Sequence, residues 1–147
     1  YVRRAVRYAE EIVEFCKCKA LSVRLFRLDY EKVVEELRRY AERAVARGAR
    51  AVILIGSLAR GDYTAFSDAH VVIVADNVPS NPAERIRDYI DPTLSVDVQL
   101  RVYTTEEFLE MARKGRRIVR EVVEYGVLLV GNGELVEEAR RLLSSAP

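Results

Sequence analysis

The spacing of hydrophobic residues changes along the chain and predicts helices and strands in alternation. Apolar residues three and four positions apart predict an amphipathic helix over residues 2 to about 20. The same spacing predicts a second helix between Asp29, which offers its cap, and Gly48, which ends it. Two runs of consecutive apolar residues, 51–55 and 71–75, predict strands that are buried on both faces.

Residues 95–103 alternate apolar and polar side chains, which predicts a strand with one apolar and one polar face. An apolar layer of helices cannot cover that polar face. Helix caps mark further elements: Asn81 before Pro82 begins a short helix, and Thr104 with Glu107 forms a capping box for the next one. The pattern also predicts a helix over 118–125, a strand over 127–130 and a helix over 134–143.

These elements predict an α+β fold with a mixed sheet of about four strands, helices packed on one face of the sheet, and a polar face left open. A chain of 147 residues can bury one core without disulfides or structural metals. We expect residues 1–28 to form an N-terminal helical extension and residues 29–147 to form the main domain.

Composition narrows the class of function. The 24 basic residues nearly cancel the 23 acidic ones, so no field of one sign favours nucleic acid or an anionic membrane as a partner. No run reaches the roughly 18 apolar residues of a membrane span, and we expect a cytoplasmic protein. We interpret Cys16 and Cys18 as small thiols in a reducing compartment, because no further cysteine completes a zinc set. The scarcity of Asn and Gln is typical of a heat-adapted source.

Gly56 and Ser57 directly follow the first buried strand. Glycine lets the backbone turn tightly there, and the turn presents amide N–H groups and a hydroxyl to the start of the next segment. Phosphate oxygens need such donors. The alternative is that this pair forms only a turn, which glycine's tolerance of positive φ explains without any ligand.

Asp68 and His70 lie two residues apart at the start of the second buried strand, so they share one face of it. Asp97 lies on the polar face of a later strand, near its beginning. If these strands are neighbours in register, the three side chains converge on one cation, and Ser57 holds the phosphates that the cation neutralises. The alternative is that Asp68 caps a turn with Ser67 and that His70 is a partly buried, hydrogen-bonded imidazole.

This arrangement resembles the nucleotidyltransferase superfamily that includes DNA polymerase β and kanamycin nucleotidyltransferase. The superfamily signature is G-S, ten to twelve residues, D-x-D and a third Asp. The sequence "GSLARG" followed by Ser67-Asp68 is most similar to that of the minimal nucleotidyltransferases. These small prokaryotic proteins often act as the antitoxin of a toxin that contains a HEPN domain. The resemblance covers roughly residues 29–130 and implies a palm-like fold as in polymerase β.

The resemblance implies metal-dependent transfer of a nucleoside monophosphate from ATP or another nucleoside triphosphate to a hydroxyl. Gly56 and Ser57 would hold the β- and γ-phosphates. Asp68 would ligate the two Mg²⁺ or Mn²⁺ ions, and Asp97 would be the third carboxylate, which binds the catalytic ion and helps to activate the attacking hydroxyl. Arg60 matches the "ARG" variant of the motif and would contact phosphate, or it is a surface arginine.

His70 departs from the pattern, because it stands where the second carboxylate of D-x-D belongs. As a metal ligand beside Asp68 and Asp97, imidazole suits Mn²⁺, Zn²⁺ or Co²⁺ better than Mg²⁺, and the site loses one negative charge. A lost contact of this kind costs ~2–4 kcal/mol of transition-state stabilisation, or roughly 30- to 1000-fold in rate.

Two functions therefore stay open: an impaired, manganese-preferring nucleotidyltransferase, and a catalytically degenerate partner-binding subunit such as the antitoxin of a HEPN pair. The sequence fixes neither the acceptor, nor the nucleobase, nor whether the chain forms a homo-oligomer.

The substitution His70→Asp should raise the affinity of the site for Mg²⁺, because it restores an oxygen ligand and a negative charge. Titration calorimetry with Mg²⁺ measures this affinity. An unchanged or weaker affinity would count against the assignment of the site to these residues.

Overall fold

A mixed sheet of five strands organises the part of the chain that the computed structural model describes, residues 7–8, 30–63 and 67–146. The strand order is β1-β5-β2-β3-β4; β2 is antiparallel to β3 and β5, whereas β4 is parallel to β3 and β1 is parallel to β5. In chain order the elements are β1 (Arg7–Tyr8), α2 (Tyr30–Ala46), β2 (Ala49–Ile55), α3 (Ser57–Arg60), β3 (Ala69–Ala75), α4 (Pro82–Tyr89), β4 (Val98–Tyr103), α5 (Thr105–Arg113), α6 (Arg117–Tyr125), β5 (Val127–Gly131) and α7 (Gly133–Ser144).

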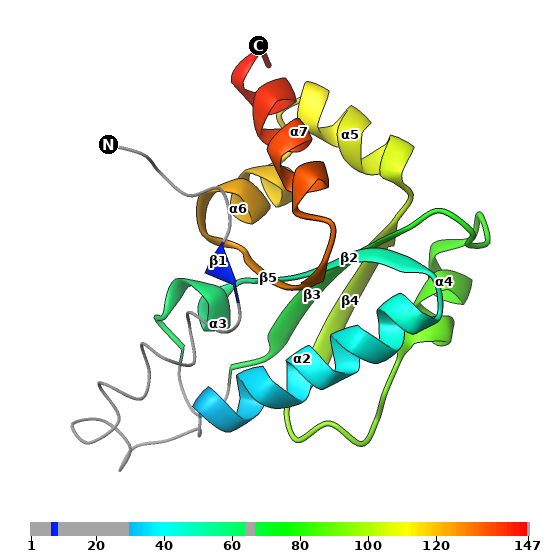
Figure 1. Cartoon of the computed structure of the whole chain (residues 1–147), viewed down its shortest axis with the longest axis vertical. Coiled ribbons are helices and arrows are strands. Elements are labelled where there is room, and N and C mark those ends of the chain that lie inside the picture. The colour runs from blue at the N-terminus through cyan, green and yellow to red at the C-terminus, as the bar shows by residue number, and fades with distance from the viewer. Residues whose placement is uncertain (1–6, 9–29, 64–66, 147) are drawn as a thin grey trace.

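Helices pack against both faces of the sheet (Figure 1). The apolar side of α2 packs against one face of the sheet, in a core that includes Leu54 of β2 and Val71 and Ile73 of β3. The helices α5, α6 and α7 lie together on the other face, where they bury Ile53 and Val72 among others. Because consecutive residues of a strand point to opposite faces, the unbroken apolar runs of β2 and β3 supply both of these clusters.

The α+β class and the mixed sheet are as the sequence predicts. The helices, however, are not restricted to one face, because central strands that are apolar on both sides need cover on both sides. The alternating polar face is that of β4, the edge strand, where Gln99 and Arg101 are exposed. Asp97 is exposed immediately before this strand.

The helix boundaries follow the predicted caps. The Thr104 side chain accepts a hydrogen bond from the Glu107 backbone at 3.1 Å, and the Glu107 carboxylate accepts one from the Thr104 backbone at 3.0 Å. This reciprocal pair is the capping box that begins α5. Asn81 caps α4 by accepting from Ala83 N, and Gly48 follows α2 with a positive φ of 116°.

The predicted helix over residues 2 to about 20 is wrong at Arg7 and Tyr8, which form the short strand β1 beside β5. The hydrogen-bonding edge of β5 decides the conformation here, and such a tertiary contact overrides a helical spacing of apolar residues. The rest of the predicted N-terminal extension, including Cys16 and Cys18, lies outside the described residues.

Arg85 of α4 is the one charged side chain among the described residues that is buried, with 7% of its surface exposed. Its guanidinium donates twice to the Glu107 carboxylate, at 2.7 and 3.2 Å, and once to the carbonyl of Val102 at 3.2 Å. It also donates to the carbonyl of Pro79. One side chain therefore ties α4 to the loop before it, to β4 and to α5.

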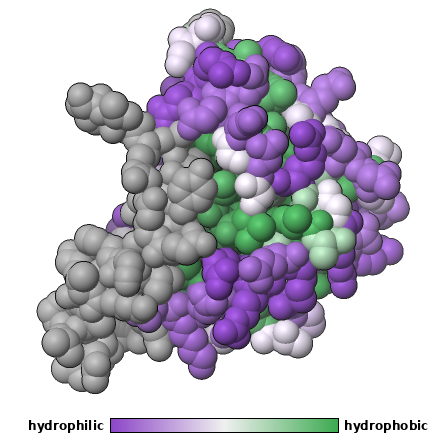
Figure 2. Space-filling model, viewed as in Figure 1, coloured by the Kyte–Doolittle hydropathy of each residue, from purple (hydrophilic) through white to green (hydrophobic). Residues whose placement is uncertain are grey.

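The surface of the described helices is largely polar. Figure 2 shows hydrophobic residues in the middle of one side of the molecule, between polar surfaces above and below them. Among the described residues, Ile90 is the only large hydrophobic side chain that is classed as exposed, at 60%. None of the helices described is both long and apolar enough to cross a bilayer.

Replacing Glu107 with Gln should lower the free energy of unfolding at pH 7 by about 2 kcal/mol, because buried Arg85 loses its charged partner while the cap is kept. Urea denaturation measures this difference, and Glu106→Gln, an exposed neighbour on the same helix turn, is the control.

The loss should depend on pH. The hydrogen bond from Arg85 lowers the pKa of Glu107, so the stabilisation is complete above the ordinary carboxyl pKa and disappears as the pH falls through the lowered value. The difference between wild type and E107Q should therefore shrink in acid. A difference that is constant with pH would contradict the role of this ion pair.

Candidate functional site

Gly56 directly follows β2 and has a backbone conformation that residues with a side chain rarely adopt, with φ of 82° and ψ of −161°. A Cβ atom at this position would lie 3.1 Å from Cδ2 and 3.3 Å from Cγ of His70. The half-buried imidazole therefore packs directly against the glycine backbone. Both the turn and the neighbouring ring require glycine here.

Ser57 begins the short helix α3 and connects the turn to the segment that contains Ser67 and Asp68. Its hydroxyl donates a hydrogen bond to the hydroxyl of Ser67 at 3.1 Å. Ser67 is followed by Asp68, and both are partly buried. This contact spans ten residues of sequence and holds the Gly56-Ser57 turn beside the beginning of β3.

The pairing of β3 with β4 places the two predicted acids next to each other. Ala69 pairs with Val98 in the parallel register, and the Ala69 N–H donates to the carbonyl of Asp97 at 2.8 Å. Asp68 and Asp97 immediately precede this pair, and continuing the register by one step sets them opposite each other. Opposed residues of a parallel pair share a face of the sheet. The two carboxylates therefore belong to the same end and the same face of neighbouring strands.

His70 and Gln99 form the next pair of that register on the same face. The Gln99 amide donates a hydrogen bond to Oδ2 of Asp68 at 3.0 Å. Gln99 is not among the predicted site residues, although it alternates with Asp97 on the polar face of the strand. The described residues contain no group of three or more His, Cys, Asp or Glu side chains arranged to hold a metal ion.

The chemistry of these donors fits one divalent cation better than two. Asp68 and Asp97 offer two carboxylates on one face, and Mg²⁺ commonly takes one or two protein carboxylates together with substrate phosphates and water. The third group of the predicted set, His70, lies with its ring against Gly56, and Asp68 already accepts from Gln99.

Arg60 makes its contacts with α6 and with Asp62. Its guanidinium donates to the Tyr125 hydroxyl at 3.1 Å and lies 5.3 Å from the centre of that ring, and it also pairs with Asp62. The Tyr125 hydroxyl in turn donates to Glu121 at 2.6 Å. These contacts raise the pKa of Arg60, the hydrogen bond to Tyr125 contributing most. The phosphate contact of Arg60 stays a prediction.

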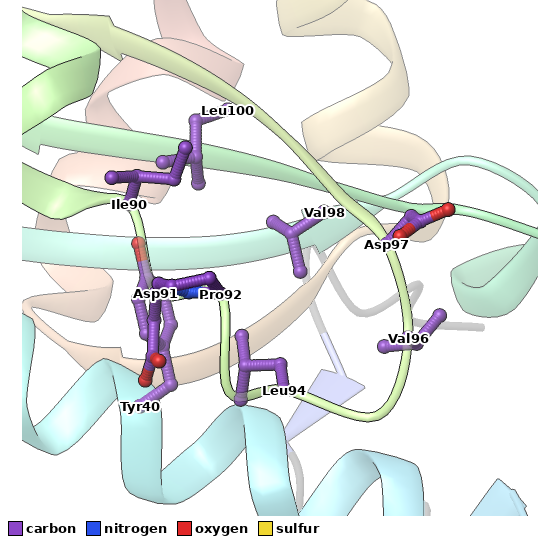
Figure 3. Close-up of a pocket in the computed structure, with 9 residues that line it drawn as sticks. All are labelled: Tyr40, Ile90, Asp91, Pro92, Leu94, Val96, Asp97, Val98 and Leu100. Atoms are coloured by element: carbon purple, nitrogen blue, oxygen red, sulfur yellow. The ribbon is translucent and has the colours of Figure 1, made fainter.

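A cavity of about 290 Å³ lies on the α2 side of the edge strand (Figure 3). Apolar side chains line most of it, including Leu94 and Val98, and Tyr40 closes one side. Asp97 lies at its rim, and its carboxylate points away from Tyr40 and Leu94 (Figure 3). Burial raises the pKa of the Tyr40 hydroxyl, which donates to the Tyr89 carbonyl. Asp97 thus helps to line the cavity, while its carboxylate points away from Tyr40 and Leu94 (Figure 3).

A glycine-serine turn after a buried strand, with two acids at the start of neighbouring strands, is the arrangement that the sequence resemblance to nucleotidyltransferases predicts. A family model described as "Nucleotidyltransferase domain" matches residues 31–129, more than half of the chain. The chain belongs to this nucleotidyltransferase domain family. No curated protein matches it.

Several solved structures resemble the chain at low identity. A Sulfolobus solfataricus protein assigned as a nucleotidyltransferase is 18% identical, with a TM-score of 0.48 over 71% of this chain and 86% of its own. A toxin-antitoxin structure with AMP-PNP is 20% identical, with a TM-score of 0.48 over 80% and 86%. The toxin-antitoxin MntA-HepT structure is 17% identical, with a TM-score of 0.47 over 78% and 84%. Identities of 17–20% and TM-scores below 0.5 assign neither a substrate nor a partner to this chain.

The substitution Gly56→Ala should destabilise the protein by about 1–3 kcal/mol, because the new methyl group meets the His70 ring and the backbone conformation is strained. Thermal or urea denaturation measures the change. Gly61→Ala is the matched control, since Gly61 also has a positive φ, 93°, but open space where its Cβ would lie. Equal losses in the two variants would show that the contact with His70 contributes nothing.

Proposed function

We propose that this chain is a metal-dependent nucleotidyltransferase that transfers a nucleoside monophosphate from a nucleoside triphosphate to a hydroxyl acceptor. The observation that carries the proposal is the parallel register that sets Asp68 opposite Asp97, on one face and beside Gly56 and Ser57. Membership of the family supports the reaction class.

The turn at Gly56 and Ser57 binds the terminal phosphates of the nucleotide. Glycine brings the backbone close to the ligand, and Ser57 offers a hydroxyl that Ser67 keeps in place. Asp68 and Asp97 hold the divalent cation, Mg²⁺ or Mn²⁺. The cation, when bound, neutralises phosphate charge and stabilises the oxygens that attack and leave. Asp97, the more exposed of the two acids, faces the acceptor hydroxyl and helps to remove its proton.

The residue at position 70 limits the rate of transfer. His70 supplies no carboxylate, so the chain binds the second cation weakly, and transfer is slow and faster with Mn²⁺ than with Mg²⁺. Nucleotide binding needs only the turn and the paired acids. It therefore persists where transfer is slow.

A second candidate function is that of a partner-binding subunit that no longer transfers nucleotides, such as the antitoxin of a HEPN-domain toxin. Two observations favour it: the His70 ring packed against Gly56, and the Gln99 amide bonded to Asp68. Both contacts occupy groups that nucleotidyl transfer requires.

One experiment separates the two functions. The purified protein is incubated with α-labelled ATP, GTP, CTP or UTP, with Mg²⁺ or Mn²⁺, and with a HEPN-domain protein or a small-molecule hydroxyl as acceptor. We expect the wild type to transfer the nucleotide faster with Mn²⁺ than with Mg²⁺. The rate of transfer should be at least tenfold lower in Asp68→Asn and in Asp97→Asn. Asp88→Asn, which removes the same charge from an exposed position on α4, is the control.

Substitutions at position 70 sharpen the result. His70→Asp should increase transfer with Mg²⁺, whereas His70→Asn, which adds no charge, should not. Absence of transfer with either cation and every acceptor, together with retained binding of the partner, would leave only the second candidate. Transfer that survives both acidic substitutions would contradict the proposed site.

A further inference from the structure

We propose that Gln99 is a positioning residue that holds the Asp68 carboxylate toward β4 and thereby limits how tightly the site binds a divalent cation. The proposal rests on the proposed function, because it assigns a role at the same pair of acids. Gln99 is the only glutamine of the chain.

The geometry comes from the register of the parallel strands. Gln99 lies opposite His70 and two residues after Asp97, so it shares the face of both acids. Its amide Nε2 lies 3.0 Å from Oδ2 of Asp68. Gln99 belongs to the edge strand and is exposed, so neither burial nor packing forces its side chain into this contact.

The contact has a direct chemical consequence. A carboxylate oxygen that accepts from an amide has less electron density to offer a cation, and the cation must displace the donor to use that oxygen. The amide thus competes with the metal for Asp68. The His70 ring lies against Gly56, and β3 itself contains no acidic residue. No carboxylate of this strand can therefore replace the Asp68 oxygen that the amide occupies.

A carboxylate at position 99 would add a ligand to the pair formed by Asp68 and Asp97. A side chain that already reaches Asp68 through its amide would reach a cation bound there through a carboxylate of the same length. Gln99→Glu thus converts a competing donor into a ligand and changes the charge by one unit.

The test is titration calorimetry of the full chain with Mn²⁺ alone at fixed ionic strength. Gln99→Met removes the amide and keeps the length of the side chain; we expect binding about fivefold tighter, since one hydrogen bond no longer has to be displaced. Gln99→Glu should bind about tenfold tighter than wild type. Arg101→Gln, the next exposed residue on the same face, changes the charge by the same unit and should have little effect.

The outcomes separate this proposal from the proposed function. Unchanged affinity in both Gln99 variants, or an equal gain in R101Q and Q99E, overturns the role of Gln99. If Asp68→Asn weakens binding in that case, the proposed function stands. If Asp68→Asn binds Mn²⁺ as the wild type does, both proposals fail. Thermal denaturation of each variant checks that all of them fold.

Discussion

The parallel pairing of β3 with β4 is the interaction on which the site depends. Its register brings Asp68 and Asp97, 29 positions apart in the sequence, to the same face and the same end of the sheet. A shift by one residue would turn one acid to the opposite face. The alternation of apolar residues in β4 prevents that shift, because it would expose Leu100 and Val102, which are buried against α2 and its neighbours. Packing of the core therefore fixes the positions of the acids.

The glycine at the end of β2 is the second constraint. Gly56 permits the backbone to turn, and it leaves room for the ring of His70. The conformation of the turn and the position of the His70 ring therefore depend on the same glycine.

The sequence predicted the strands and most of the helices correctly, because long apolar runs and reciprocal caps are strong local signals. It did not predict β1, since two residues at the edge of a sheet carry no periodic pattern. It placed Asp68 and Asp97 near each other only on the condition of a neighbouring register. The hydrogen bond of Gln99 and the contact of Arg60 with Tyr125 depend on side-chain orientation and on segments far apart in the sequence, and no local pattern encodes either of them.

The strand β1 has a consequence for the solubility of shortened forms of the protein. Arg7 and Tyr8 pair with Val127 and Leu128 of β5, and β5 is apolar over most of its length. A chain that begins after Tyr8 would leave this side of β5 as an unpaired edge, with free backbone donors and acceptors beside buried aliphatic side chains. Exposed apolar edges of this kind promote strand-to-strand aggregation. Two residues at the beginning of the chain thus protect the sheet against self-association.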